Sequence, residues 1–358
     1  MTDQLKNQKD LAREHVTSSW PLIKQLARSL PAYTDIERIV ICGCGDSHHA
    51  SLSLAMGFSE LTHMRCHPSE SMNAARYLIP QYESEADRVL VIGISASGEV
   101  ARTIEAVEMA KRIGARSLAF TGSGVGTLAK TASNSIVFPG PQLPHGPGLI
   151  SYLSSLLMGY ALMHHVVEEQ GQLEIDRAMD KLFSGMGAWV TDRWESGLRF
   201  ADESEEGLCV FLGSGPAYGS ALFAAAKLLE ASGEHAWGQD VEEWAHLEYF
   251  DAIAPMRTWL LSANGRSMTR EFEVRDAAHA IGRNWHEDRW DILGPEHGEL
   301  NEILAPIVLW AGPSAYASRR TEMMNEIPFR NFEGGRNRKE GGGASRIRSS
   351  VRSISFGG

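Results

Sequence analysis

The sequence predicts an α/β protein of two domains, each a three-layer sandwich with a mainly parallel sheet between helices. Short apolar runs alternate with longer segments of helical spacing, which is the pattern of βαβ units. A strand, a Gly-rich turn and a helix follow one another near residue 40 and again near residue 210, so the chain reads as two copies of one unit. A length of 358 residues is enough for two hydrophobic cores.

The chain divides into five predicted segments. They are a leading helix (1–30), a first α/β domain (31–170), a connecting helix (171–200), a second α/β domain (201–332) and a Gly/Arg-rich tail (333–358). Pro21 either kinks the leading helix or starts a second one. The glycines of the tail favour disorder, whereas its arginines would bind an anion if the tail folded over a site. Both interpretations of the tail stay open.

The composition is that of a globular protein with 43% hydrophobic and 22% charged residues. A net charge of −11 argues against nucleic acid as the main partner. The N-terminus has no apolar segment typical of a signal peptide, and no apolar run reaches membrane-spanning length. The four cysteines have no zinc-site spacing, so we expect them to be reduced and buried in a cytoplasmic protein without a membrane partner.

Periodicity predicts the regular elements of the first domain. Strands are expected at 38–42, 64–68 and 88–94, and helices at 99–114 and 150–169. The run 88–94 is apolar throughout, as expected for a strand buried on both faces. The segment 140–148 is too rich in Pro and Gly to be regular.

A small polar turn, Ser95-Ala96-Ser97-Gly98, joins the apolar strand to its helix. Free N–H groups at a helix start, together with hydroxyl donors, favour a bound anion. A dinucleotide fingerprint and a P-loop are both missing from this turn, so those two ligand classes are not favoured.

The second domain repeats this layout. A strand is expected at 208–212, followed by the turn Gly213-Ser214-Gly215 and a helix at 221–230, with further strands at 258–261 and 306–310. The segment 170–200 between the domains is expected to be mostly helical, with interruptions at Gly185 and Gly187.

The stretch around the first turn resembles the sugar isomerase (SIS) domain family. The matching residues are Ser95, Ser97, Gly98, Glu99 and Thr103, followed by Ala110-Lys111-Arg112-Ile113-Gly114-Ala115 and the strand Ser117–Thr121. The resemblance implies that Ser95, Ser97 and nearby backbone, Gly98 included, hold the phosphate of a phosphosugar. It also implies that Ser47, in the turn after the first strand, touches the sugar or its anion. His48 is a further possible contact, whereas His49 is at least as well explained as an ordinary residue at a helix start.

Three positions depart from the family pattern: Val100 and Asp46 stand where hydroxyl residues are usual, and Arg102 stands where Asp is usual. Asp46 would repel a phosphate dianion unless Arg102 or His48 offsets its charge. A sulfonate carries a single charge and would tolerate Asp46 better. Phosphate and sulfonate therefore both stay open, with Arg102 as a possible ligand of either.

The second domain resembles the isomerase half of glucosamine-6-phosphate synthases and the fructosamine-6-phosphate deglycases. The matching residues are Gly213, Gly215, Tyr218, Lys227, Leu228, Glu230, Glu243 and His246. The resemblance implies that Glu230 moves a proton between C1 and C2 of an open-chain sugar. It implies that His246 assists ring opening or shuttles a proton, reaching into the neighbouring subunit of a dimer.

The same resemblance suggests two further contacts, His145 in the 140–148 loop and Arg330 in Phe329-Arg330-Asn331-Phe332. The synthases also have a glutamine-hydrolysing domain and a lysine that forms an imine near their C-terminus. We expect neither here, so ammonia-dependent synthesis is not expected.

We therefore expect a cofactor-independent aldose–ketose isomerase of a hexose with an anionic group at C6, in a homodimer or larger homo-oligomer. Enediol chemistry needs a carboxylate base and a second acid–base group, but no metal or redox cofactor. The alternatives are a deglycase of 6-phosphofructosyl amines or amino acids, and a non-catalytic sugar-phosphate sensor.

Overall fold

The computed structural model describes residues 2–141, 148–205, 207–250 and 256–325. The sequence-based expectations for His145, Arg330 and the tail (333–358) lie outside these residues.

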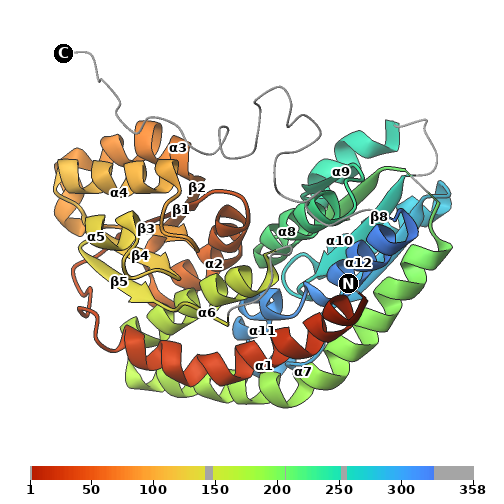
Figure 1. The fold of residues 1–358 in the computed structure, drawn as a ribbon, viewed down its shortest axis with the longest axis horizontal. Helices are drawn as coiled ribbons and strands as arrows, with labels where there is room; N and C mark the ends of the chain where they lie inside the picture. Colours follow the sequence, from red (N-terminus) through yellow and green to blue (C-terminus); the bar gives the residue numbers. More distant parts are fainter. Residues whose placement is uncertain (1, 142–147, 206, 251–255, 326–358) are drawn as a thin grey trace.

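Two parallel sheets confirm the predicted fold class (Figure 1). The first has the order β2-β1-β3-β4-β5 and the second has the order β7-β6-β8-β9. The strands of the first sheet are β1 (Arg38–Gly43), β2 (Arg65–Glu70), β3 (Val89–Ser95), β4 (Arg116–Thr121) and β5 (Asn134–Val137). Those of the second are β6 (Cys209–Leu212), β7 (Ala236–Gln239), β8 (Arg257–Ser262) and β9 (Asn284–Arg289). Every pair within a sheet is parallel, so ligand-binding turns are expected at the carboxyl ends of the strands.

Helices surround both sheets. Those up to residue 166 are α1 (Thr2–Ala27), α2 (Asp46–Thr62), α3 (Ser71–Asn73), α4 (Ala101–Ile113), α5 (Thr127–Thr131) and α6 (Leu149–Val166), with a π-helical turn at Ala74–Leu78 and a 3-10 segment at Ile79–Arg88. The later ones are α7 (Glu169–Glu203), α8 (Pro216–Ala231), α9 (Val241–Leu247), α10 (Met268–Ala280), α11 (Leu300–Ile303) and α12 (Ala311–Met323), with 3-10 turns at Glu248–Phe250, Pro295–His297 and Ala305–Ile307. Figure 1 shows α1 and α7 running together along one side of both sheets.

Helices α2 and α8 pack closely where the two domains meet. A Cβ atom added at Gly219 of α8 would lie 2.2 Å from Ser53 Oγ and 2.3 Å from the His49 carbonyl of α2. Ser53 also donates a hydrogen bond to the Pro216 carbonyl at 3.0 Å. Because Gly219 lacks a side chain, the backbones of α2 and α8 can lie close together. Helix α8 of the second domain is thereby held close to the first domain.

Several sequence-based expectations were wrong. The apolar run 306–310 is not a strand but a buried 3-10 turn leading into α12, since short apolar runs suit buried helical segments equally well. Helix α7 continues through Gly185 and Gly187, where neighbouring side chains from Ile292 and Arg13 approach its backbone. Helix α1 continues through Pro21 as one element, so no second helix starts there, and a kink at Pro21 stays a prediction.

The cysteines agree with expectation only in part. All four are free, and Cys42 and Cys209 are buried. Cys66 is half-buried, and Cys44 is exposed because it lies at the tip of the turn after β1.

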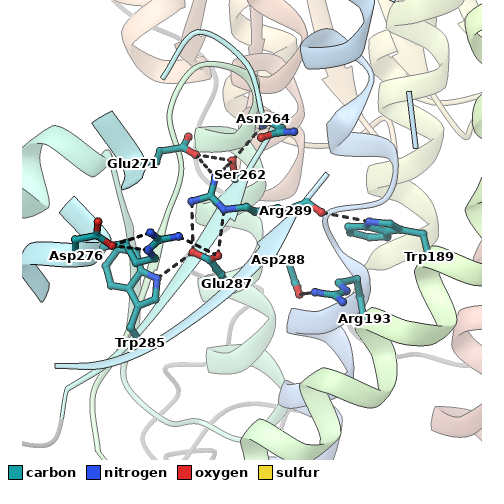
Figure 2. A network of polar contacts seen from close by, with 11 residues as sticks. Trp189, Arg193, Ser262, Asn264, Glu271, Asp276, Trp285, Glu287, Asp288 and Arg289 are labelled. Carbon is teal, nitrogen blue, oxygen red and sulfur yellow. Dashed lines mark hydrogen bonds and ion pairs between the residues drawn. The ribbon is translucent and has the colours of Figure 1, made fainter. Parts of the chain in front are cut away.

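A fully buried carboxylate, Asp288 on β9, faces α7. Its Oδ1 lies 3.7 Å from Arg193 Nη1, as Figure 2 shows, and neither of its oxygens has a hydrogen-bond partner among the described residues. Burial raises the pKa of Asp288 to about 7, against the opposing effect of Arg193.

We expect the stability of Asp288→Asn relative to the wild type to be higher at pH 8 than at pH 4.5. The folded pKa of Asp288 lies above the unfolded value, so its contribution to stability falls as pH rises from about 4 to 7. Urea unfolding at pH 4.5 and 8 should show the variant gaining roughly 1–4 kcal/mol relative to wild type over this range. The exposed neighbour Asp192 provides the control, and an equal pH dependence in Asp192→Asn and Asp288→Asn would contradict the assignment.

Gly219→Ala is expected to lower the free energy of unfolding by about 1–3 kcal/mol, because the added methyl group forces α2 and α8 apart. Gly124→Ala is the matched control, since its Cβ would meet Val137 at ordinary contact distances of 3.5 and 3.7 Å. Chemical denaturation of both variants measures the difference, and similar losses in the two would refute the packing argument.

Candidate functional site

Two turns lie at the carboxyl edge of the first sheet. Cys42 pairs with Gly93 in the parallel register of β1 and β3, so these neighbouring strands end at the same edge. The turn after β1 runs from Gly43 to Ser47, and the turn after β3 runs from Ser95 to Gly98. We call the pair of turns the first cradle.

The Ser95–Gly98 turn is held in shape by its own hydrogen bonds. The Gly98 N–H donates to both the carbonyl and the hydroxyl of Ser95, each at 3.1 Å. Gly98 has φ +71°, a conformation that favours glycine. Ser95 is buried, whereas Ser97 is exposed and accepts a hydrogen bond from the Glu99 N–H at 3.3 Å. The Ser97 hydroxyl is therefore the one that an outside anion can reach most directly.

Glu99 fastens the same turn to α5. Its carboxylate accepts from the Thr127 N–H at 2.7 Å and from the Thr127 hydroxyl at 2.8 Å. This carboxylate is thereby held at the start of α5, an arrangement that the helix dipole favours.

Arg102 points to a carboxylate of its own helix. It forms an ion pair with Glu105, whose buried side chain also accepts from Arg76 Nε at 2.8 Å. Much of the Arg102 charge is therefore compensated by Glu105. The role of Arg102 as an anion ligand stays a prediction.

Ser47 and His48 occupy the first turn of α2. Ser47 is half-buried and packs against Gly43, where an added Cβ would lie 2.5 Å from Ser47 Cβ. His48 Nε2 lies 3.5 Å from Glu70 Oε1, and its Nδ1 lies 3.3 Å from Ser51 Oγ. Burial lowers the pKa of His48, although Glu70 opposes the shift. His48 is thus expected to be neutral near pH 7 and able to donate or accept a hydrogen bond.

A lysine from the second domain joins the first cradle. Lys227 Nζ donates to Asp46 Oδ2 at 2.7 Å and to Glu230 Oε2 at 2.5 Å. The Lys227 side chain is only 3% exposed, whereas those of Asp46 and Glu230 are 20% and 31% exposed. Burial by itself would lower the pKa of Lys227, but Asp46 and Glu230 outweigh it and raise the pKa.

The start of α6 completes this part of the site. A Cβ added at Gly148 would lie 2.8 Å from Asp46 Oδ2 and 3.9 Å from Lys227 Nζ. Lys227 also keeps the pKa of Asp46 below its usual value, although burial acts in the opposite direction. The result is a charged ammonium between two carboxylates, with Glu230 as the carboxylate more open to solvent.

His246 is not part of this cluster within one chain. It lies on α9, is 72% exposed, and its Nε2 lies 3.1 Å from Glu242 Oε1. Glu242 in turn accepts from Arg270 Nε at 2.7 Å. The structure therefore brings Glu230 to the first cradle but leaves His246 on the surface, paired with a different carboxylate.

The Asp46–Lys227 contact is the feature that the sequence did not reveal. Lys227 was visible as a motif residue three positions before Glu230, and Asp46 was visible as a departure from the family pattern. Nothing local connects them, since they are separated by 181 positions in the sequence.

Neither a metal site nor a membrane-spanning helix is found among the described residues. Within the described part of the chain, His, Cys, Asp and Glu side chains form no group of three or more that could hold a metal ion. Among the same residues, the helices are all too short or too polar to cross a membrane.

Residues 32–165, the part that carries the first cradle, match the family model of the SIS domain. These residues form a SIS domain. The chain is 30% identical over 293 residues to an isomerizing glutamine–fructose-6-phosphate aminotransferase of Methanothermobacter thermautotrophicus, a match that covers 76% of this chain. The chain spans less than half the length of this relative, 47%, so the activity of the whole relative does not transfer to it directly.

Solved structures show that the chain shares its whole fold with other proteins. A candidate phosphosugar isomerase of Clostridium difficile 630 aligns with a TM-score of 0.76 at 15% identity, covering 90% of this chain and 94% of the other. A candidate tagatose-6-phosphate ketose/aldose isomerase of Clostridium novyi NT aligns with a TM-score of 0.73 at 17% identity, covering 98% and 93%. At these identities the similarity shows the fold alone.

Lys227→Met is expected to destabilise the protein by about 3 kcal/mol, because it leaves two partly buried carboxylates without their cation. Asp46→Asn should cost less, and the double variant should recover part of the loss. A double-mutant cycle in urea should give a coupling energy above about 1 kcal/mol. The exposed pair Lys181–Glu296 is the control and should couple by less than about 1 kcal/mol. Equal coupling in the two pairs would contradict the assigned role of Lys227.

Proposed function

We propose that the chain is a cofactor-independent aldose–ketose isomerase of a hexose that carries an anionic group at C6. The observation that carries this proposal is the Lys227 bridge, which holds the Glu230 carboxylate beside the first cradle. An isomerase of this kind needs an anion-binding turn and a carboxylate base within one pocket.

In the proposed reaction Glu230 removes a proton from C1 of the open-chain ketose and returns it to C2 of the enediol. O2 gains a proton as the enediol forms and O1 loses one as the aldehyde forms, so the carbonyl group moves from C2 to C1. Lys227 supports this step because its ammonium can donate a hydrogen bond to the oxygen on which negative charge develops. When the ammonium of Lys227 turns from Glu230 to the substrate oxygen, its other hydrogen bond, to Asp46, keeps it oriented.

The exposed Ser97 hydroxyl and the N–H groups that precede α4 are the proposed anion ligands, with Ser47 and His48 nearer the sugar. Val100 cannot donate a hydroxyl, and Asp46 adds negative charge close by. A sulfonate, with one charge, therefore stays in the proposal beside a phosphate.

The exposure of His246 supports a shared active site. His246 is 72% exposed and pairs with Glu242 on its own helix, so its ring is accessible to a second subunit. We propose a homodimer in which His246 of each chain assists ring opening in the site of the other.

A deglycase is the second candidate, and Asp46 favours it. Asp46 and Glu230 place two carboxylates at one ammonium, and carboxylate oxygens are favourable partners for a cationic nitrogen of a substrate. In that reaction Glu230 would act on a 6-phosphofructosyl amine, and the amine would leave.

Proton exchange in deuterated water, followed by NMR, tests these proposals. Fructose 6-phosphate, its C6-sulfonate analogue and a 6-phosphofructosyl amino acid are supplied in turn. We expect deuterium at C1 or C2 of one of the simple sugars, with a rate at least 100-fold lower in Glu230→Gln because the amide cannot accept the proton. The exposed Glu203 on α7 is the matched control, and Glu203→Gln should keep the wild-type rate.

The three substrates separate the outcomes. Exchange into the sulfonate alone would identify the anion as a sulfonate. Release of free amine and glucose 6-phosphate from the third compound, without exchange into the others, would reject the isomerase and support the deglycase. No reaction with any of the three, together with retained binding, would reject both enzymes and favour a sensor.

A further inference from the structure

The second sheet carries a counterpart of the first cradle. The strand order β2-β1-β3-β4 is repeated as β7-β6-β8-β9, so β6 corresponds to β1 and β8 to β3. Gly45 after β1 has φ 58° and ψ −128°, and Gly215 after β6 has φ 56° and ψ −132°. The two turns therefore share one backbone conformation.

The turns after β3 and β8 correspond in sequence as well. Ser95-Ala96-Ser97-Gly98 follows the first, and Ser262-Ala263-Asn264-Gly265 follows the second. In each turn the serine hydroxyl accepts from a backbone N–H at 3.1 Å, but the donor is the third residue of the chain after Ser95 and the second after Ser262. The residue with positive φ also differs, being Gly98 in the first turn and Asn264 in the second. We call the turns after β6 and β8 the second cradle.

The packing of α2 on α8 extends this correspondence. Glu230 lies fifteen positions after Gly215 on α8, and Glu60 lies fifteen positions after Gly45 on α2. As α8 brings Glu230 to the first cradle, α2 brings Glu60 to the second, where Arg266 Nη1 donates to Glu60 Oε1 at 2.7 Å. The counterpart of Lys227 is Gly57, so the second cradle has no bridging ammonium.

A side chain of the protein occupies the second cradle. Glu302 of α11 is 94% buried, and its carboxyl group lies against the backbone of the two turn glycines. A Cβ added at Gly265 would lie 2.2 Å from Glu302 Cδ, and one added at Gly215 would lie 3.4 Å from Glu302 Oε1. Arg266, just before α10, places its Nε 3.8 Å from Glu302 Oε2.

The serine of the second cradle is likewise engaged. Figure 2 shows Ser262 between Glu271 and Arg289, with its hydroxyl donating to Glu271 Oε2 at 2.5 Å and accepting from Arg289 Nη1 at 3.1 Å. Glu271 is fully buried and also accepts from Ser267 Oγ at 2.7 Å. The hydroxyl of Ser262, the counterpart of Ser95, is thus bonded to a carboxylate of the chain itself.

We propose that the second cradle is a latent oxyanion site in which the Glu302 carboxylate takes the place of the ligand. Each chain then binds one anionic ligand, in the first domain, and Glu302 excludes a second. Removing the Glu302 carboxylate opens the second cradle to a tetrahedral oxyanion such as phosphate, sulfate or tungstate. The role of the first cradle is taken from the proposed function, but the occupancy of the second rests on its own contacts.

The surrounding charges set the expected strength of the opened site. Arg266 is shared with Glu60 and with Glu299, whose Oε1 lies 2.9 Å from Arg266 Nη2. These two carboxylates remain after Glu302 is removed and repel an anion. We therefore expect the opened site to bind oxyanions more weakly than the first cradle, and the test needs a concentrated, directly visible probe.

Crystals of the full chain soaked in tungstate test the proposal through the anomalous signal of tungsten. We expect the wild type to show no tungstate at Gly265 and Arg266, and Glu302→Ala to show it there. Glu302→Gln is the matched control and should show none, because its amide still fills the cradle. Glu302→Ser is a second variant that empties the cradle and keeps a small polar side chain at this position.

Two results would overturn the proposal. One is tungstate in the second cradle of the wild type, with Glu302 displaced. The other is an empty second cradle, or tungstate at lattice contacts only, in whichever of Glu302→Ala and Glu302→Ser folds. Tungstate missing from the first cradle in every crystal would count against the proposed function alone, since the two cradles are read out separately.

Discussion

The ammonium of Lys227 is the interaction on which the arrangement of the site depends. It is nearly inaccessible to water and is therefore stable as a charge only because Asp46 and Glu230 accept its hydrogen bonds. One of these carboxylates belongs to the first domain and the other to the second. The ion pair thus fixes the position of Glu230 relative to the first cradle, which packing of apolar side chains alone would not specify.

The two halves of the protein use one backbone design with different charges. The glycines Gly45 and Gly215 share one backbone conformation, and the turns after β3 and β8 are similar in sequence. The first cradle receives a lysine and an accessible glutamate, whereas the second receives an arginine and a buried glutamate. The two edges therefore differ in a few side chains and not in fold.

Local chemistry explains which parts of the site could be predicted. The Ser95–Gly98 turn was predictable because small hydroxyl residues and a positive-φ glycine are a local signal, and Lys227 and Glu230 are close because they lie three positions apart on one helix. His246 carried a motif signal, but its distance from Glu230 within the chain depends on where α9 packs. The run 306–310 was misassigned because it is buried on all sides, and burial removes the periodicity that separates strands from helices.

Local patterns in the sequence predicted the α/β class, strands β1, β2, β3, β4, β6 and β8, and the two turns, because periodicity and turn chemistry act between residues near one another in the chain. They did not predict the edge strands β5, β7 and β9. The tertiary structure decided which carboxylate faces which cradle. Asp46 meets Lys227, and Glu302 enters the second cradle, only because α2 and α8 cross at Gly219 and α11 packs against α2. Such contacts join distant residues, and their energies depend on burial and on the exact crossing of helices, neither of which a local pattern records.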